Sequence, residues 1–201
     1  MSQTIAANVA PGRMITSTNL DGSISETWGI ECSEEKLKAL VKELFEEHWN
    51  EIVFGPCVQG AVFEGRMFAK PTFKYLDGYA TVEIEGSEGW HFHLCLGPHK
   101  GTKNRPTPPE LAAWRKCTRA AFFRDTDISG RPGSWGLRFW NGRDEQMMTV
   151  FFPGPWYDRD AGKFRKEPDW TQLDLWMALR EKYAGVPAEG PLASAEAPRM
   201  H

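Results

Sequence analysis

The sequence lacks any run of apolar residues that approaches the about 20 needed to cross a membrane as a helix. It also lacks an excess of positive charge, because 24 lysine and arginine residues are set against 27 aspartate and glutamate residues. The formal net charge is −3, whereas proteins that bind nucleic acid usually present a basic surface. The composition therefore argues against a membrane-spanning protein and against a nucleic-acid partner.

Cysteine is scarce and scattered, with four residues in 201 and no pair at the C-x-x-C spacing. Residues 1–19 are polar and contain no apolar core of a secretory signal. Widely spaced cysteines without such a signal are typical of reduced thiols rather than of a disulfide framework. We therefore expect a cytoplasmic protein.

Large aromatic side chains are abundant, with 9 tryptophans and 12 phenylalanines. The simplest interpretation is an aromatic-rich core, and the alternative is a cavity for a flat or apolar ligand. The apolar and charged fractions, 41% and 25%, are ordinary for a globular domain. A chain of 201 residues is long enough to bury a real core.

Residue spacing predicts three helices. Apolar residues recur every three or four positions over residues 33–49, where Ser33 is placed to cap the helix. A Thr-Pro-Pro-Glu start predicts a second helix over residues 107–122. An aspartate followed by a similar apolar spacing predicts a third helix over residues 169–183.

Alternation of apolar and polar residues predicts antiparallel strands between these helices. Asp77 and Gly78 separate two alternating runs, which is a strong signal for a two-residue hairpin turn. A third alternating run at residues 90–96 and a further hairpin over residues 135–152 continue the pattern. The connections are too short for parallel crossovers.

These elements predict an α+β fold, namely an antiparallel meander sheet of about five or six strands with three helices packed on one face or at the ends. We expect this single domain to cover residues 32–184. Residues 1–31 are expected to be extended or poorly ordered, with a short edge strand around Trp28. Residues 185–201, rich in proline, alanine and glutamate, are expected to form a disordered tail.

Three of the five histidines and one cysteine fall within residues 90–100. On a strand, His91, His93 and Cys95 lie on one face, and His99 follows just beyond the next turn. Histidines at i and i+2 lie roughly 6–7 Å apart at Cα, so both rings can reach one ion. Imidazole and thiolate are ligands of transition metals. We therefore predict a site for iron, zinc or copper, formed by His91, His93, His99 and Cys95.

The register of this strand decides which neighbours the histidines have. In one register Glu83 and Glu85 lie beside them and complete a two-histidine, one-carboxylate site for non-haem iron. In the other register the histidines share a face with Val82 and Ile84, because a slip of one residue exchanges the faces. The length of the turn at residues 86–89 decides, and the sequence leaves both registers open.

A second hypothesis is a non-covalent haem-binding or haem-handling protein. Haem needs one axial ligand, apolar walls for the ring and cations for its carboxylates. Any one of the three histidines can supply the ligand, and no C-x-x-C-H motif is present for covalent attachment. The candidate cations are Arg115, Arg119 and Arg138, with Lys100 as a further choice.

A third hypothesis is a non-catalytic interaction domain, in which exposed tryptophans and Met147-Met148 form a partner surface. The sequence contains no phosphate-binding loop and no Gly-x-Ser-x-Gly nucleophile elbow. It therefore leaves open whether the chain is an enzyme, and it does not indicate an oligomeric state. The partner expected under the first two hypotheses is a metal ion or a small molecule.

Overall fold

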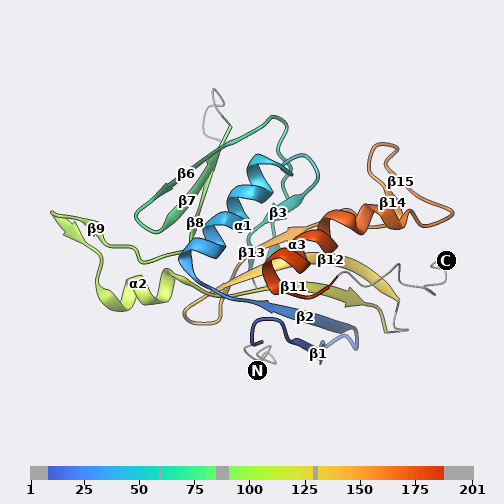
Figure 1. Cartoon of the computed structure of the whole chain (residues 1–201), viewed down its shortest axis with the longest axis horizontal. Helices are drawn as coiled ribbons and strands as arrows, with labels where there is room; N and C mark the ends of the chain where they lie inside the picture. The colour runs from blue at the N-terminus through green and yellow to red at the C-terminus, as the bar shows by residue number, and fades with distance from the viewer. Residues whose placement is uncertain (1–8, 59, 85–90, 129–130, 188–201) are drawn as a thin grey trace. The chain divides into compact units, whose positions relative to one another are not determined.

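The structure is a computed structural model that describes residues 9–58, 60–84, 91–128 and 131–187 (Figure 1). The described residues contain three α-helices, one 3-10 helix and fifteen strands, most of them short. The strand pairings of the hairpins are antiparallel. The predicted α+β fold class is therefore confirmed.

Six strands form the largest sheet, and β2 lies inside it, between β1 and β11. The sequence predicted that the residues around Trp28 form a short edge strand. This is wrong, because β1 pairs with β2 as a hairpin and covers that edge. The order is β1 (Met14–Thr18), β2 (Ile24–Ile30), β11 (Cys117–Thr126), β12 (Pro132–Asn141), β13 (Gln146–Phe151) and β3 (Val53–Gly55).

Backbone contacts divide the chain into two compact units. We call one the α3 unit, which comprises Met1–Ile30, Ala121–Leu137 and Phe151–His201. The other is the α1 unit, which comprises Glu31–Ala120 and Arg138–Val150. Each unit is built from segments that are far apart in the sequence.

The α3 unit is organised around an arginine buried between two tryptophans. The Arg180 guanidinium carbon lies 4.7 Å from the ring centre of Trp28 and 4.6 Å from that of Trp176. Arg180 is only 1% exposed, and a desolvated cation–π contact contributes about 2 kcal/mol. The Trp176 indole N–H also donates to the Gly136 carbonyl at 3.1 Å.

The third predicted helix is confirmed in this unit. The Asp169 side chain accepts from the Thr171 amide at 3.2 Å and caps a 3-10 turn, Trp170–Leu173. Helix α3 (Asp174–Ala184) follows it directly. Gly185 ends α3 in the left-handed conformation (φ 69°), which glycine adopts without steric cost.

In the α1 unit, helix α1 (Glu34–Glu46) packs on a three-stranded meander (Figure 1). The Phe45 ring meets Phe54 and Phe92 edge-on, with ring centres 4.9 and 5.0 Å apart. The predicted apolar face is confirmed, but α1 ends before His48 and Trp49, which we had placed on it. The buried residues of α1 are Leu37, Leu40, Val41, Leu44 and Phe45.

The predicted hairpin turn is confirmed at Asp77 and Gly78, whose φ values are 49° and 81°. Two positive φ values are typical of the turn that suits the twist of a hairpin. A side chain on Gly78 would also lie 2.6 Å from the carbonyl oxygens of Gly97 and Pro98. The turn joins two strands of the meander, which consists of β6 (Thr72–Leu76), β7 (Tyr79–Glu83) and β8 (His91–Cys95).

The second predicted helix is correct at its start and wrong at its end. Helix α2 (Pro109–Arg115) is followed by Lys116 in an extended conformation, and residues 117–126 form strand β11 instead of more helix. Most side chains of β11 are buried on both faces, and such a continuous apolar run suits a buried helix or an inner strand equally. Pro108, rather than Thr107, occupies the cap position.

The remaining strands are two residues long and pair as small hairpins. Among the described residues, no helix has the combination of length and apolar composition needed to cross a membrane. The pairs are β4 (Cys57–Val58) with β5 (Ala61–Val62), β9 (Gly101–Thr102) with β10 (Arg105–Pro106), and β14 (Tyr157–Asp158) with β15 (Lys163–Phe164).

Leu44 tests the packing of α1. Its side chain is fully buried, whereas Leu76 at the end of β6 is 78% exposed. We expect Leu44→Ala to lower the free energy of unfolding by about 2–5 kcal/mol, because it leaves a cavity. The matched variant Leu76→Ala should cost less than about 1 kcal/mol. Urea denaturation checks both, and equal losses would contradict this account of the core.

Candidate functional site

The predicted histidines lie on the face of the meander that points away from α1. Phe92 points to the opposite face and packs on Phe45 of α1, so its neighbours His91 and His93 face outward. Directly opposed residues of antiparallel strands share a face. Six residues of β7 and β8 share this outer face as three pairs, Glu83 with His91, Thr81 with His93, and Tyr79 with Cys95.

This pairing decides the register that the sequence left open. Glu83 lies opposite His91, as required for the arrangement with the carboxylate beside the histidines. Val82 and Phe92 form a pair on the other face, and Val82 is fully buried. Glu85, the turn at residues 86–89 and Trp90 lie outside the described residues.

His91 and His93 are both exposed, and their ring centres lie 5.0 Å apart. Nδ1 of His93 lies 2.7 Å from the Thr81 hydroxyl. When Nδ1–H donates to that hydroxyl, the lone pair of the ring is on Nε2, and the ring orientation is fixed. This is the tautomer that binds a metal through Nε2.

Glu83 forms an ion pair with a lysine on the neighbouring strand. Its carboxylate accepts from the Lys74 ammonium. That hydrogen bond is the main cause that lowers the pKa of Glu83, and the nearby imidazoles of His91 and His93 add to it. The outer face therefore carries a charged carboxylate on β7, two imidazoles on β8 and an ammonium on β6.

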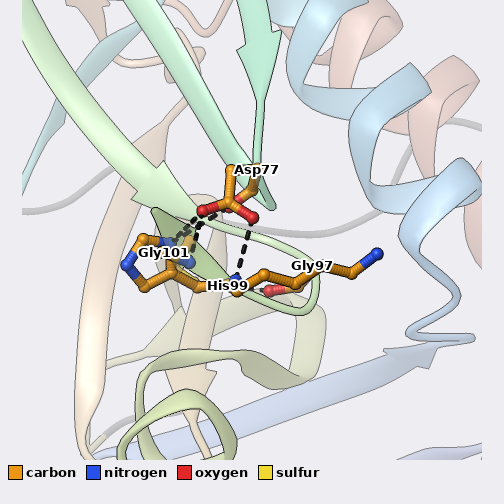
Figure 2. Close-up of polar contacts among 6 residues, drawn as sticks. Asp77, Gly97, His99 and Gly101 are labelled. Atoms are coloured by element: carbon orange, nitrogen blue, oxygen red, sulfur yellow. Dashed lines mark hydrogen bonds and ion pairs between the residues drawn. The ribbon is translucent and has the colours of Figure 1, made fainter. Parts of the chain in front are cut away.

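His99 and Asp77 form a separate pair at the other end of β7 (Figure 2). Nδ1 of His99 lies 2.9 Å from a carboxylate oxygen of Asp77. The same carboxylate accepts from the backbone N–H groups of Lys100 and Gly101, each at 2.8 Å. These contacts hold the loop after β8 against the Asp77 turn.

Cys95 lies near this end of the sheet as a buried thiol. It is 3% exposed, and its sulfur donates to the Gly97 carbonyl oxygen at 3.5 Å. Burial raises the pKa of the Cys95 thiol above its ordinary value, despite a hydrogen bond from the Tyr79 hydroxyl. Arg115 also bonds to that hydroxyl, and the His99 ring lies edge-on to Tyr79 at 4.9 Å.

The structure thus brings His91 and His93 together and places His99 and Cys95 around Tyr79. Among the residues that the structure describes, one set of three potential metal ligands has ligand atoms within 4.8 Å of one another. That set is Glu43, in the last turn of α1, with Glu47 and His48, which follow the helix. A metal centre on the four predicted ligands stays a prediction.

A family model of proteins of unknown function, DUF7676, matches residues 14–185. The chain belongs to the DUF7676 family. No curated protein matches it.

The solved structures similar to this DUF7676 protein have 13–16% sequence identity to it. A crystal structure of ChuX is 16% identical over 78% of each chain, with a TM-score of 0.44. A protein from Erwinia carotovora is 16% identical over 78% of this chain and 76% of its own, with a TM-score of 0.49. A further structure, described as the haem-binding protein ChuX, is 13% identical over the same shares, with a TM-score of 0.47. A likeness at this level does not carry a ligand from one protein to another.

The three predicted arginines lie in different surroundings. Arg115 is exposed and contacts Tyr79 at the outer face of the meander. Arg119 is 7% exposed, with its guanidinium carbon 3.6 Å from the Trp140 ring centre. Arg138 is half-buried on β12. Of these three, Arg115 contacts the face that carries the histidines.

Two features of this face were missed in the sequence. Lys74 and Thr81 lie opposite each other on β6 and β7, a pairing that the two-residue turn at Asp77 already implies. The surface of exposed tryptophans and Met147-Met148 stays a prediction; among the described residues five tryptophans and Met148 are buried. The buried tryptophans are Trp28, Trp135, Trp140, Trp156 and Trp176.

Asp77 makes stability depend on pH. The backbone N–H groups of Lys100 and Gly101, with His99, hold its pKa below the ordinary value. A lowered native pKa stabilises the fold above the unfolded pKa of about 3.9, and the contribution is lost as the pH falls through the native pKa. Asp77→Asn keeps one acceptor oxygen and tolerates φ 49°. We expect it to be less stable than the wild type near neutral pH, with a difference that shrinks below about pH 4.

Urea denaturation of both proteins across this pH range measures that difference. A gap that stays constant down to the lowest pH would contradict the role of the Asp77 charge.

Proposed function

We propose that this DUF7676 protein binds haem non-covalently on the outer face of β6, β7 and β8, with His93 as the axial ligand. The observation that carries the proposal is the exposed His93 ring, whose Nδ1 is held by Thr81 at 2.7 Å. The lone pair of Nε2 is then available to an iron atom above the sheet. His91, 5.0 Å away ring to ring, is the alternative ligand.

The same face supplies apolar contacts for a flat ring. Leu76, 78% exposed, is paired with Tyr79 at the turn end of the face. Tyr79 and Cys95 lie two residues along the strands from Thr81 and His93, which corresponds to roughly 7 Å. A porphyrin bound to His93 reaches that far, so its edge would lie over these two side chains.

Cations for the two haem carboxylates lie at the margins of this surface. Arg115 bonds to the Tyr79 hydroxyl at one end, and its exposed guanidinium can bind a carboxylate in a bidentate manner. Lys74 is exposed on β6, opposite Thr81, and would have to leave its partner Glu83 to bind a haem carboxylate. Arg119, in contrast, is occupied by Trp140 and by Asp144, whose carboxylate lies 3.4 Å from its Nε.

A bare transition-metal ion is the second candidate ligand of the same face. It is favoured by the two imidazoles at 5.0 Å together with Glu83 opposite His91. Iron, zinc and copper all accept imidazole and carboxylate ligands. In this case the ion would have to displace Lys74 from Glu83.

Titration with haemin tests the first candidate. We expect the wild type to bind one haemin with a change in the Soret band. Loss of the iron–nitrogen bond in His93→Ala should weaken binding by at least about tenfold. His48→Ala removes a histidine outside the meander and is the matched control, for which we expect wild-type binding. Equal affinity of all three proteins would contradict axial ligation by His93.

Two further measurements separate ring stacking and a bare ion from haem ligation. Iron-free protoporphyrin should bind weakly and should not distinguish the wild type from His93→Ala. Binding of zinc or copper that requires both His91 and His93, without any Soret change on addition of haemin, would replace haem by the metal ion. Absence of both kinds of binding would exclude haem and these metal ions as ligands of this face.

A further inference from the structure

Two cysteines that are far apart in the sequence meet in the α1 unit. Cys32 lies two residues before α1, and Cys117 is the first residue of β11. The thiol groups of Cys32 and Cys117 are hydrogen-bonded to each other. Both cysteines are in the reduced form.

The course of the backbone explains this meeting. Strands β2 and β11 are neighbours in the sheet, and Thr126 at the end of β11 bonds to the Ile24 carbonyl at the start of β2. The two strands are therefore antiparallel, so the chain leaving β2 arrives beside the first residues of β11. The contact between the thiols follows from the pairing of these strands.

The two thiols differ in access. Cys117 is fully buried, with its sulfur 3.4 Å from the Arg119 carbonyl oxygen. Cys32 is partly exposed. A small reagent in solvent therefore reaches Cys32 more readily than Cys117.

The pKa values of the two thiols also differ. The hydrogen bond from Cys117 lowers the pKa of Cys32 despite its partial burial. A backbone hydrogen bond at Ala120 and then the charges of Lys116 and Arg119 lower it further. The same contact and burial raise the pKa of Cys117. Arg119 is fixed for this role by its stacking on Trp140 and its ion pair with Asp144. An accessible thiol with a lowered pKa beside a buried thiol with a raised pKa is the arrangement of redox-sensing cysteines.

We propose that Cys32 and Cys117 form a redox-active dithiol that hydrogen peroxide converts to a disulfide. In the first step the Cys32 sulfur attacks one peroxide oxygen, an S–O bond forms and the O–O bond breaks. The second oxygen leaves as hydroxide and takes up a proton to become water. Cys32 loses two electrons and becomes a sulfenic acid, and the peroxide is reduced by the same two electrons.

In the second step the Cys117 sulfur attacks the Cys32 sulfur. The S–S bond forms, the S–O bond breaks, and the departing hydroxide leaves as water with the proton of the Cys117 thiol. An external dithiol reverses the reaction by thiol–disulfide exchange. The disulfide covalently joins the segment before α1 to the start of β11.

Treatment of the reduced full-length protein with hydrogen peroxide, followed by denaturation and maleimide labelling, tests this proposal. The chain has four cysteines, so we expect labelling to fall from four maleimides per chain to two, and to return to four after dithiothreitol. A tryptic digest should contain one cross-linked peptide pair that carries Cys32 and Cys117. Four maleimides after peroxide, or a cross-link through Cys57 or Cys95, would overturn the proposal.

Variants assign the two roles. Cys117→Ser should stop at the sulfenic acid of Cys32, which dimedone traps, and Cys32→Ser should leave Cys117 unoxidised. Cys95→Ser removes a buried thiol whose pKa burial raises and should form the cross-link like the wild type. In the native reduced protein, iodoacetamide should modify Cys32 at least about tenfold faster than Cys95. Equal rates, or dimedone labelling of the wild type as strong as that of Cys117→Ser, would contradict the assignment.

Discussion

One residue of register between β7 and β8 determines the chemistry of the histidine face. Val82, Leu94 and Phe92 point to the side of the meander that meets α1, so their burial fixes which residues point outward. A slip by one residue would bring His91 and His93 against α1 and expose the apolar row. The free energy of core packing therefore selects the arrangement in which Thr81 and Glu83 flank the histidines. No interaction among the outer residues themselves is needed to determine which residues point outward.

The hairpin turn and helix α1 of the α1 unit could be predicted from the sequence, because each depends only on residues close together in the chain. Positive φ values at Asp77 and Gly78 suit the residues there, and the apolar spacing of α1 is a property of one helix. The end of α2 could not be predicted in the same way. The apolar run from Cys117 onward is compatible with helix and strand alike, and only its position between β2 and β12 in the sheet makes it a strand.

The histidine site was predicted in part for the same reason. His91 and His93 share a face because alternation along one strand requires it, whereas the position of His99 depends on the turn that Asp77 anchors. No local pattern in the sequence indicates the contact between Cys32 and Cys117, because two cysteines this far apart look like any unrelated pair. Strand pairing brings them together, and strand pairing between distant segments is the part of a fold that single-sequence patterns reveal least.

The openness of the histidine face bears on the kind of binding it can support. A flat ligand on one sheet face keeps its other side in water, so it buries about half of the apolar area that an enclosed pocket would bury. With one axial bond and two surface cations, Arg115 and Lys74, such a site favours reversible binding over permanent retention. Surface charge pairs are also weakened by salt. Under the proposed haem binding, this geometry is therefore better suited to uptake and release of the ligand than to its permanent retention.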